Sequence, residues 1–218
     1  MSILHIDSLS KNFGEKIILQ NIFLSCKTGD IVGILGRNGC GKSTLFNIIF
    51  GTVKSDFDFI KIDQTILKNQ WSRRNKIAYL PQHHFLPKNI SVINALQLFC
   101  SDTNTKIISD LEYIKPFLEE RTKNLSSGEL RIVETLVIIF SDHPFALLDE
   151  PFHSISPKIV SDLKIFIQQQ SKNKGFIISD HSYQDVLDIC NRNYLLKDAN
   201  LREITDFNDL KKFNYIPK

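Results

Sequence analysis

The stretch Ile31–Thr44 reads Ile-Val-Gly-Ile-Leu-Gly-Arg-Asn-Gly-Cys-Gly-Lys-Ser-Thr. Its first five residues form a short apolar run that predicts a strand buried on both faces. Gly36–Thr44 follow this strand and match the pattern G-x-x-x-x-G-K-[ST]. Leu45, Ile48 and Ile49 then recur at the three- and four-residue spacing of an amphipathic helix. A strand, a glycine-rich loop and a helix in this order predict an α/β fold with a phosphate-binding loop.

The glycine-rich loop carries the residue types that bind a nucleoside triphosphate. Its glycines allow the backbone to curl, so that successive N–H groups point at phosphate oxygens near the positive end of the helix dipole. We expect Lys42 to reach the β- and γ-phosphates and the Ser43 hydroxyl to bind Mg²⁺. An ordinary glycine-rich turn, the alternative, does not account for Lys-Ser-Thr standing in register with strand and helix. The predicted nucleotide-binding residues of this loop are Gly36, Arg37, Asn38, Gly39, Cys40, Gly41, Lys42, Ser43 and Thr44.

Length and composition restrict the class of protein. The chain has 218 residues, 42% hydrophobic and 23% charged, close to soluble globular averages and sufficient for one full-sized domain. A net charge of +3 is too small to indicate nucleic-acid binding, and no nucleic acid is expected as a partner. No apolar run approaches the roughly 20 residues of a membrane span, and we expect no secretion signal. The scattered cysteines, without a C-x-x-C pair, favour a reducing cytosol over a disulfide scaffold.

Further short apolar runs predict that the first strand belongs to a mainly parallel sheet. These runs are Ile77–Leu80, Phe145–Leu148 and Phe176–Ser179. Helix-length patterns lie between them, so we expect helices on both faces of the sheet. The N-terminal region instead alternates apolar and polar residues, as in Ile18–Leu24 and Phe57–Ile62, which predicts an antiparallel β subdomain.

Two other regions complete the predicted organisation. Residues from about 90 to 125 have a helical, more polar pattern with no strong strand, which indicates a helical insertion. The segment from Asn193 onward predicts two short strands, Tyr194–Leu196 and Leu201–Ile204, and a final short helix.

A pair of carboxylates follows one of the predicted buried strands. Phe145–Leu148 are apolar, and Asp149 and Glu150 come directly after them. We expect Asp149 to reach the Mg²⁺ coordination sphere and Glu150 to polarise a water for attack on the γ-phosphate. The alternative is a strand that merely ends in acidic residues. The presence of the phosphate-binding loop in the same chain favours the catalytic interpretation.

A third motif, Leu125-Ser126-Ser127-Gly128-Glu129, lies upstream of that strand and leads into a helical run. Here the chain resembles the nucleotide-binding subunits of ABC transporters, whose signature is Leu-Ser-Gly-Gly-Gln. The resemblance covers essentially all 218 residues, because further family motifs appear in order. It implies a P-loop NTPase core in a single domain, residues 1–218, with a helical subdomain at about residues 83–130.

The resemblance also implies roles for individual residues. Phe13 stands where the family has an aromatic residue that stacks on adenine. Gln82, in Tyr-Leu-Pro-Gln, matches the glutamine that senses Mg²⁺ and the membrane partner. His181 matches the switch histidine that contacts the γ-phosphate. The signature contributes nucleotide contacts from Ser126, Ser127, Gly128 and Glu129.

An assembly follows from the family resemblance. The signature of one subunit faces the phosphate-binding loop of another, and two subunits enclose two ATP molecules head to tail. The chain is therefore expected to pair with itself or a related subunit, and to hydrolyse ATP with Mg²⁺. It would act with separate membrane permease subunits and lie peripherally on the cytoplasmic face of the membrane. Its Asp-Glu-Pro-Phe, Tyr-Leu-Pro-Gln and Ser-Asp-His stretches are similar to the branch that includes lipopolysaccharide-transport ATPases.

Two positions depart from the family pattern, and several alternatives stay open. Ser127 replaces a signature glycine, and Ser156 stands where the family usually has Asp. We expect the first change to retune the ATP site shared by two subunits and the second to slow or desynchronise hydrolysis. The alternatives are a soluble, cluster-assembly-like ABC ATPase, or a weakly hydrolysing subunit paired with an active homologue. For Phe13 and His181, a purely structural role is the other interpretation.

Overall fold

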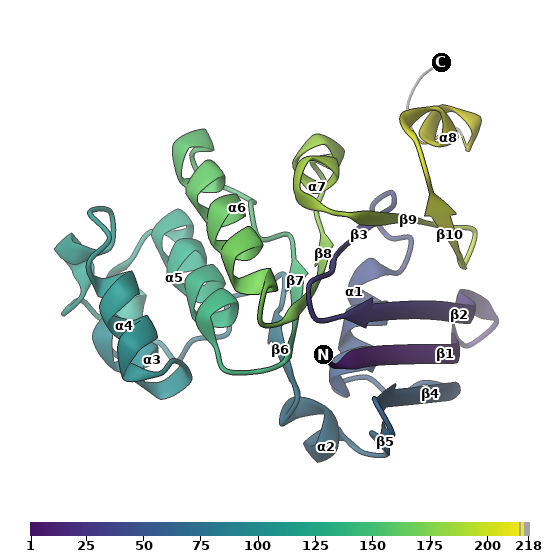
Figure 1. Cartoon of the computed structure of the whole chain (residues 1–218), viewed down its shortest axis with the longest axis horizontal. Coiled ribbons are helices and arrows are strands. Elements are labelled where there is room, and N and C mark those ends of the chain that lie inside the picture. The colour runs from purple at the N-terminus through teal and green to yellow at the C-terminus, as the bar shows by residue number, and fades with distance from the viewer. Residues whose placement is uncertain (214, 216–218) are drawn as a thin grey trace.

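The computed structural model describes residues 1–213 and 215, which form two β-sheets with helices packed around them (Figure 1). The strands are β1 (Ile3–Phe13), β2 (Lys16–Lys27), β3 (Ile31–Leu35), β4 (Phe57–Ile62), β5 (Thr65–Ile66), β6 (Ile77–Leu80), β7 (Phe145–Asp149), β8 (Gly175–Ser179), β9 (Arg192–Lys197) and β10 (Asn200–Ile204). The helices are α1 (Lys42–Phe50), α2 (Gln70–Arg74), α3 (Val92–Phe99), α4 (Asp102–Ser109), α5 (Ser127–Phe140), α6 (Pro157–Ser171), α7 (Tyr183–Ile189) and α8 (Phe207–Lys212). Two 3-10 helices, η1 (Lys115–Phe117) and η2 (Thr122–Asn124), precede α5.

The larger sheet is the predicted parallel one. It has six strands in the order β10-β9-β3-β8-β7-β6, and β3, β6, β7, β8 and β9 pair in parallel while β10 runs antiparallel to β9. The smaller sheet, β2-β1-β4-β5, is antiparallel, as the alternating patterns predicted. The chain therefore has the predicted fold class, and both terminal strands predicted from residue 193 onward are present.

Two separate hydrophobic cores lie on the two faces of the larger sheet. In β3, Val32 and Ile34 pack into one core, and Ile31 and Leu35 pack into the other. This division follows from strand geometry, because successive side chains point to opposite faces. It also explains why the strand sequences are continuously apolar.

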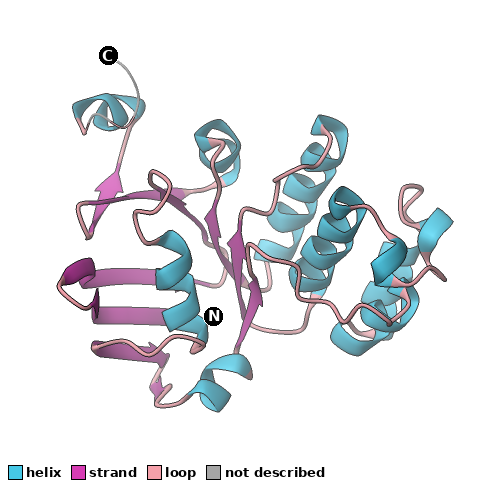
Figure 2. Cartoon of the chain, turned by 180° about the vertical axis from the view of Figure 1, so that it is seen from behind, coloured by secondary structure: helices cyan, strands magenta, loops and turns pink. Residues whose placement is uncertain are grey.

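One core contains α1, and the other contains most of the remaining helices. The α1 core joins Leu45, Phe46 and Ile49 to the inner face of the antiparallel sheet, whose buried residues include Leu4 and Leu24. Figure 2 shows α1 beside both sheets. The opposite core is built by residues of α3 to α7 packed on the other face of the larger sheet. Helices thus cover both faces, as predicted.

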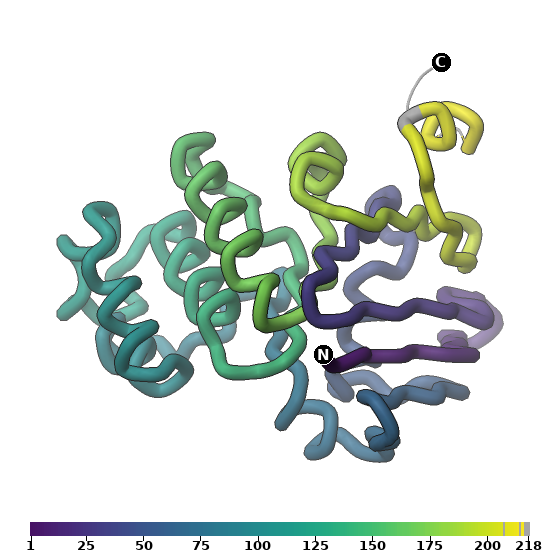
Figure 3. Tube along the Cα trace, in the orientation of Figure 1, coloured from purple at the N-terminus to yellow at the C-terminus, as the bar shows by residue number. Residues whose placement is uncertain are grey.

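The segment between β6 and α5 contains the helices α3, α4, η1 and η2, and its chain comes back beside the residue that precedes α3. Ser91 and Ser101 cap α3 and α4, since their side chains accept hydrogen bonds from the N–H groups of the third residue in each helix. An isolated bridge joins Ser91 to Arg121, so the chain closes on itself before α5 begins (Figure 3). The three-residue turns of the 3-10 helices η1 and η2 differ from the α-helical periodicity that predicted a helical insertion at about residues 90–125. Within residues 1–213 and 215, no helix is long and apolar enough to cross a bilayer.

Candidate active site

The phosphate-binding loop connects β3 to α1 and depends on glycine at two positions. Gly41 caps α1 with φ of 113°, a conformation that side chains with a Cβ rarely adopt. Gly36 needs its small size, because a Cβ there would lie 2.5 Å from the Cys40 Sγ and 2.8 Å from the carbonyl oxygen of Leu196. The glycines of the motif therefore have direct structural reasons in this chain.

A cavity of about 340 Å³ opens above this loop and collects residues that are distant in sequence. The reason is the strand order, because β3, β8, β7 and β6 are parallel neighbours whose C-terminal ends share one edge of the sheet. The residues that line the cavity are Ile18, Asn38, Gly39, Gly41, Lys42, Ser43, Thr44, Gln82, Glu150 and His181. The topology thus brings residues of four of the sequence motifs to one place.

Lys42 lies buried at the base of the cavity. Its Nζ donates to the carbonyl oxygens of Gly36 at 2.7 Å and of Arg37 at 3.3 Å. The ammonium group is thus held against the phosphate-binding loop, next to the place where a phosphate would bind. It is positioned to exchange these carbonyl oxygens for phosphate oxygens with little side-chain movement.

The three predicted catalytic residues meet at the carboxylate of Glu150. Gln82 Nε2 donates to both carboxylate oxygens at 3.2 Å, and His181 Nε2 lies 2.6 Å from Oε1. Glu150 is 5% exposed, whereas the His181 side chain is 40% exposed and faces the cavity. This arrangement places a carboxylate and two polar side chains around the space above the phosphate-binding loop.

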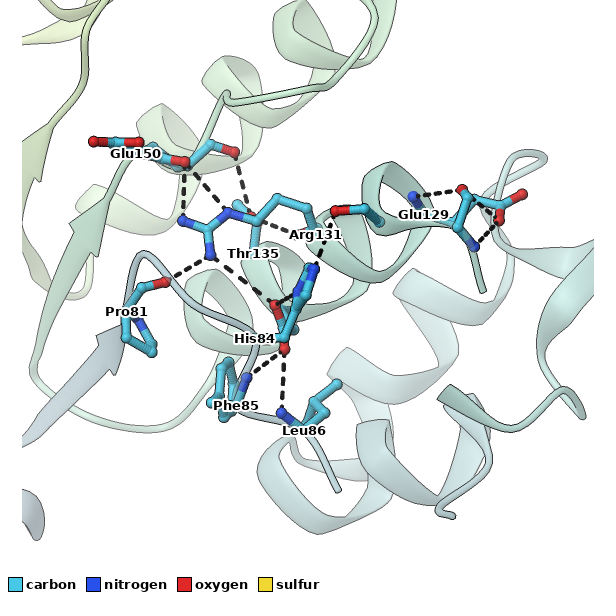
Figure 4. A network of polar contacts seen from close by, with 12 residues as sticks. Pro81, His84, Phe85, Leu86, Glu129, Arg131, Thr135 and Glu150 are labelled. Carbon is cyan, nitrogen blue, oxygen red and sulfur yellow. Dashed lines mark hydrogen bonds and ion pairs between the residues drawn. The ribbon is translucent and has the colours of Figure 1, made fainter. Parts of the chain in front are cut away.

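The backbone at Glu150 is strained and held in place by Arg131. Glu150 has φ of 56°, in the left-handed region that costs a residue with a Cβ about 1 kcal/mol or more. The buried guanidinium of Arg131 donates to the carbonyl oxygens of Asp149 and Glu150, and at 2.7 Å to that of Pro81 (Figure 4). Burial lowers the Arg131 pKa, and nearby carboxylates, above all that of Glu134, oppose the effect. One side chain of α5 therefore ties the end of β7 to the segment after β6.

Asp149 has the environment of a metal ligand. It is fully buried, and its Oδ1 accepts a 2.5 Å hydrogen bond from the Ser179 hydroxyl. Its Oδ2 is buried without a hydrogen-bond partner among the described residues. Such an oxygen normally has a ligand, because burying an unpaired polar atom is costly. Ser43 and Gln82 line the cavity and Asp149 does not; the three oxygen donors are of the type that suits Mg²⁺, and their role as its ligands stays a prediction.

Asp180 connects two loops of the site, a role that the sequence motifs did not reveal. Its carboxylate accepts the N–H groups of Phe152 at 3.2 Å and Ser182 at 3.0 Å. Burial raises the Asp180 pKa, and these two N–H groups oppose the effect. Its place beside His181 in Ser-Asp-His was the available signal, as was the position of Arg131 as a charged residue inside the apolar run of α5.

The signature residues lie apart from the cavity, at the start of α5. Ser126 and Glu129 form a reciprocal capping box: Ser126 Oγ accepts the Glu129 N–H, and Glu129 Oε2 accepts the Ser126 N–H at 2.8 Å. None of the four predicted signature residues lines the cavity that holds Lys42 and Glu150.

Gly128 has no space for a side chain, because a Cβ at this position would lie 2.9 Å from the carbonyl oxygen of Ser154. Alanine normally stabilises a helix relative to glycine by roughly 0.5–1 kcal/mol. We expect Gly128→Ala to have the opposite sign and to lower the free energy of unfolding by about 1–3 kcal/mol. Denaturant unfolding measures the effect, and a stabilised variant would contradict the close approach.

Phe13 lies at the β1–β2 hairpin, opposite Lys16. The residue is 54% exposed, and the ammonium group of Lys11 lies over its ring. It is not among the residues that line the cavity. A second cavity of about 400 Å³ shares Ile18 with the first and includes Lys16, Arg37 and Cys40. Adenine stacking by Phe13 stays a prediction.

Comparison with known proteins identifies the family. Residues 19–153 match the family model described as ABC transporter. The chain belongs to the ABC transporter family. This confirms the resemblance drawn from the motifs, and the chain is an ABC-type ATPase that binds ATP.

Relatives of this ABC family member include ATP-binding subunits of transporters. It is 30% identical over 211 residues to the lipopolysaccharide export system ATP-binding protein LptB of Haemophilus influenzae, covering 90% of this chain and 87% of that protein. The LptB of Escherichia coli K12 is 29% identical over 216 residues, covering 92% and 89%. A probable ABC transporter ATP-binding protein of Azorhizobium caulinodans is 31% identical over 201 residues, covering 86% and 72%.

Solved structures of ABC proteins share the fold. An ATP-binding subunit of an ABC transporter superposes with a TM-score of 0.86 at 20% identity, covering 99% of this chain and 95% of that one. A nucleotide-free ATP-binding cassette from an ABC transporter gives 0.77 at 22% identity, covering 100% and 96%. The ABC ATPase architecture is therefore present throughout the chain.

Proposed function

We propose that this ABC family member is the ATP-binding subunit of a transporter, and that it acts as one nucleotide-binding domain. It hydrolyses ATP in a head-to-tail dimer and drives substrate movement through separate membrane subunits. The observation that carries the proposal is the cavity where Lys42, Ser43, Gln82, Glu150 and His181 converge. These side chains supply a phosphate-binding cation, oxygen ligands for a metal, and a carboxylate in reach of an attacking water.

The proposed hydrolysis assigns one task to each group. Lys42 moves from the Gly36 carbonyl to the β- and γ-phosphates. Ser43, Asp149 and Gln82 would hold Mg²⁺, which would neutralise charge developing on the phosphates. Glu150 orients a water in line with the γ-phosphorus and accepts its proton. His181, whose Nε2 lies 2.6 Å from Glu150 Oε1 in the structure, turns from that carboxylate and donates to the γ-phosphate.

The proposed dimer follows from the separation of the signature from its own cavity. Ser126–Glu129 begin α5 but do not line the cavity beside Lys42. A second subunit, taken here as a copy of this chain, would bring its signature to the open side of that cavity and enclose the nucleotide. Two identical sites then form about a two-fold axis.

An apolar groove beside Gln82 supports the proposal that a membrane subunit binds this chain. It has a volume of about 340 Å³ and is lined by aromatic and aliphatic side chains, including Phe50, Tyr79, Pro81, Phe85, Phe99 and Ile138. Pro81 and Phe85 flank Gln82 in sequence, so a segment bound there would touch the loop that contacts Glu150. We propose that an apolar helix of the membrane subunit occupies this groove, with the chain on the cytoplasmic face of the membrane.

The substrate class is proposed from the relatives. The H. influenzae and E. coli proteins, at 30% and 29% identity, are named as lipopolysaccharide export ATP-binding proteins. The proposed substrate is therefore a lipid of the lipopolysaccharide type, which the transporter would extract from the membrane. A soluble ABC ATPase without a membrane partner is the competing function.

A pull-down from native membranes tests the proposal. Tagged Glu150→Gln protein is recovered in gentle detergent with ATP, and co-purifying proteins are identified by mass. We expect an integral membrane protein in stoichiometric amount, whose substrate is then tested with lipopolysaccharide. A sample carrying Lys42→Ala as well, which should lose ATP, is the matched control. Recovery with soluble partners only would reject the transporter and favour the soluble class.

A further inference from the structure

The serine that departs from the family signature has a partner elsewhere in the chain. Ser127 Oγ lies 3.1 Å from Nε2 of His84, a residue two positions after Gln82. This contact links the start of α5 to the loop that carries Gln82. A glycine at position 127 would have no side chain to make it.

His84 is itself oriented by a buried carboxylate. Its Nδ1 lies 2.9 Å from Oε2 of Glu134, which is fully buried in α5. The other oxygen of Glu134 accepts the backbone N–H groups of Phe85 at 2.7 Å and Leu86 at 3.1 Å. Figure 4 shows this group of contacts beside Arg131. The loop after Gln82 is therefore attached to α5 through both its backbone and the His84 ring.

The chemistry of these groups fixes the direction of the hydrogen bonds. A carboxylate only accepts, so His84 Nδ1–H donates to Glu134. In the neutral imidazole, Nε2 then accepts a hydrogen bond from the Ser127 hydroxyl, whereas in the protonated ring Nε2–H donates to Ser127 Oγ. In either form the contact holds the Ser127 side chain in one rotamer.

We propose that His84 is a positioning residue that holds the Ser127 side chain toward its own subunit, so that the altered signature still closes on the nucleotide of the partner subunit. Without His84, the hydroxymethyl group is free to occupy space that a signature glycine leaves open. His84 and Ser127 then act as a matched pair, since the histidine is needed only because the serine is present. This inference rests on the head-to-tail dimer of the proposed function.

The adjacent histidine provides a control. His83 is exposed in the same loop and has no hydrogen bond or ion pair with any residue that the structure describes. His84→Asn is the most informative variant. Its side-chain amide stands where Nδ1 stands and can still donate to Glu134, but asparagine is too short to reach Ser127. This variant therefore removes the contact to Ser127 and keeps the attachment of the loop to Glu134.

The test measures ATP-dependent dimerisation by analytical ultracentrifugation, in Glu150→Gln protein so that ATP persists. We expect His84→Asn and His84→Ala to raise the dimer dissociation constant about tenfold, because closure must then confine a free Ser127 side chain to one of about three rotamers at each of two sites. Ser127→Gly should dimerise at least as well as the parent. The decisive sample is the double variant His84→Asn/Ser127→Gly, which should match Ser127→Gly, since the histidine then has nothing to hold. His83→Ala should have no effect.

The outcomes separate this inference from the function on which it rests. An equal loss on replacing His84 in the serine and glycine backgrounds, or no loss in either, would overturn the role of His84 alone. Failure of the parent to dimerise with ATP would instead contradict the assembly by two copies of this chain, and the inference with it. Thermal unfolding of each variant shows whether the alanine change has damaged the fold. If it has, His84→Asn alone decides.

Discussion

Glu150→Gln is expected to lower ATP turnover by at least about a hundredfold while ATP binding persists. The amide keeps the size of the side chain and its place between Gln82 and His181. It cannot accept the proton of an attacking water at neutral pH. The loss therefore falls on kcat, because no contact to the bound nucleotide is removed.

Phosphate release under saturating ATP measures this effect, and a fluorescent ATP analogue measures binding. Glu119→Gln, a change at an exposed carboxylate of the same type, serves as the control and should leave turnover unchanged. Turnover near the parent value in Glu150→Gln would reject Glu150 as the general base. A comparable loss of ATP affinity would indicate that the cavity itself had been distorted.

Arg131→Met is expected to lower the free energy of unfolding by about 3 kcal/mol or more. The guanidinium of Arg131 satisfies the backbone carbonyl oxygens of Asp149, Glu150 and Pro81 inside the protein. Methionine fills similar space but leaves these oxygens without donors and Glu134 without its nearby cation. The left-handed backbone at Glu150 also loses its support.

Urea unfolding followed by circular dichroism measures this change. Arg131→Lys should recover only part of the stability, because a single ammonium group cannot reproduce the planar fork of donors. Arg121→Met, at an exposed arginine, should change the stability by less than about 0.5 kcal/mol. A small effect of Arg131→Met would show that the carbonyl oxygens find other donors.

The sequence predicted those parts of the fold and site that depend on local patterns. The phosphate-binding loop is one example, because its strand, its glycines and its helix are consecutive in Ile31–Phe50. The continuous apolar runs of β6, β7 and β8 similarly predicted that these strands are buried on both faces of the sheet. The convergence of Gln82, Glu150 and His181 was expected from the family, and the strand order supplies its physical cause.

Contacts between side chains far apart in sequence were not predictable in this way. The helical periodicity of α5 marks Arg131 and Glu134 as ordinary positions of a helix, although both are buried and bind the loop after β6. The sequence offered no reason to distinguish His83 from His84, since only the path of the loop brings one of them to Ser127. The strain at Glu150 likewise depends on the turn between β7 and α6.

The division of the interior into two cores has a consequence for how such a chain can diverge. Leu45 and Phe46 of α1 share one core with Leu147 and Ile177, whereas the residues of α5 and α6 lie in the other core. Substitutions that share no packing partners combine additively in their effects on stability. Core substitutions around the phosphate-binding helix α1 can therefore be compensated separately from those around the signature helix α5. The helical half can be refitted to a new partner without disturbing the packing of α1, provided that Arg131 keeps its contacts to Asp149, Glu150 and Pro81.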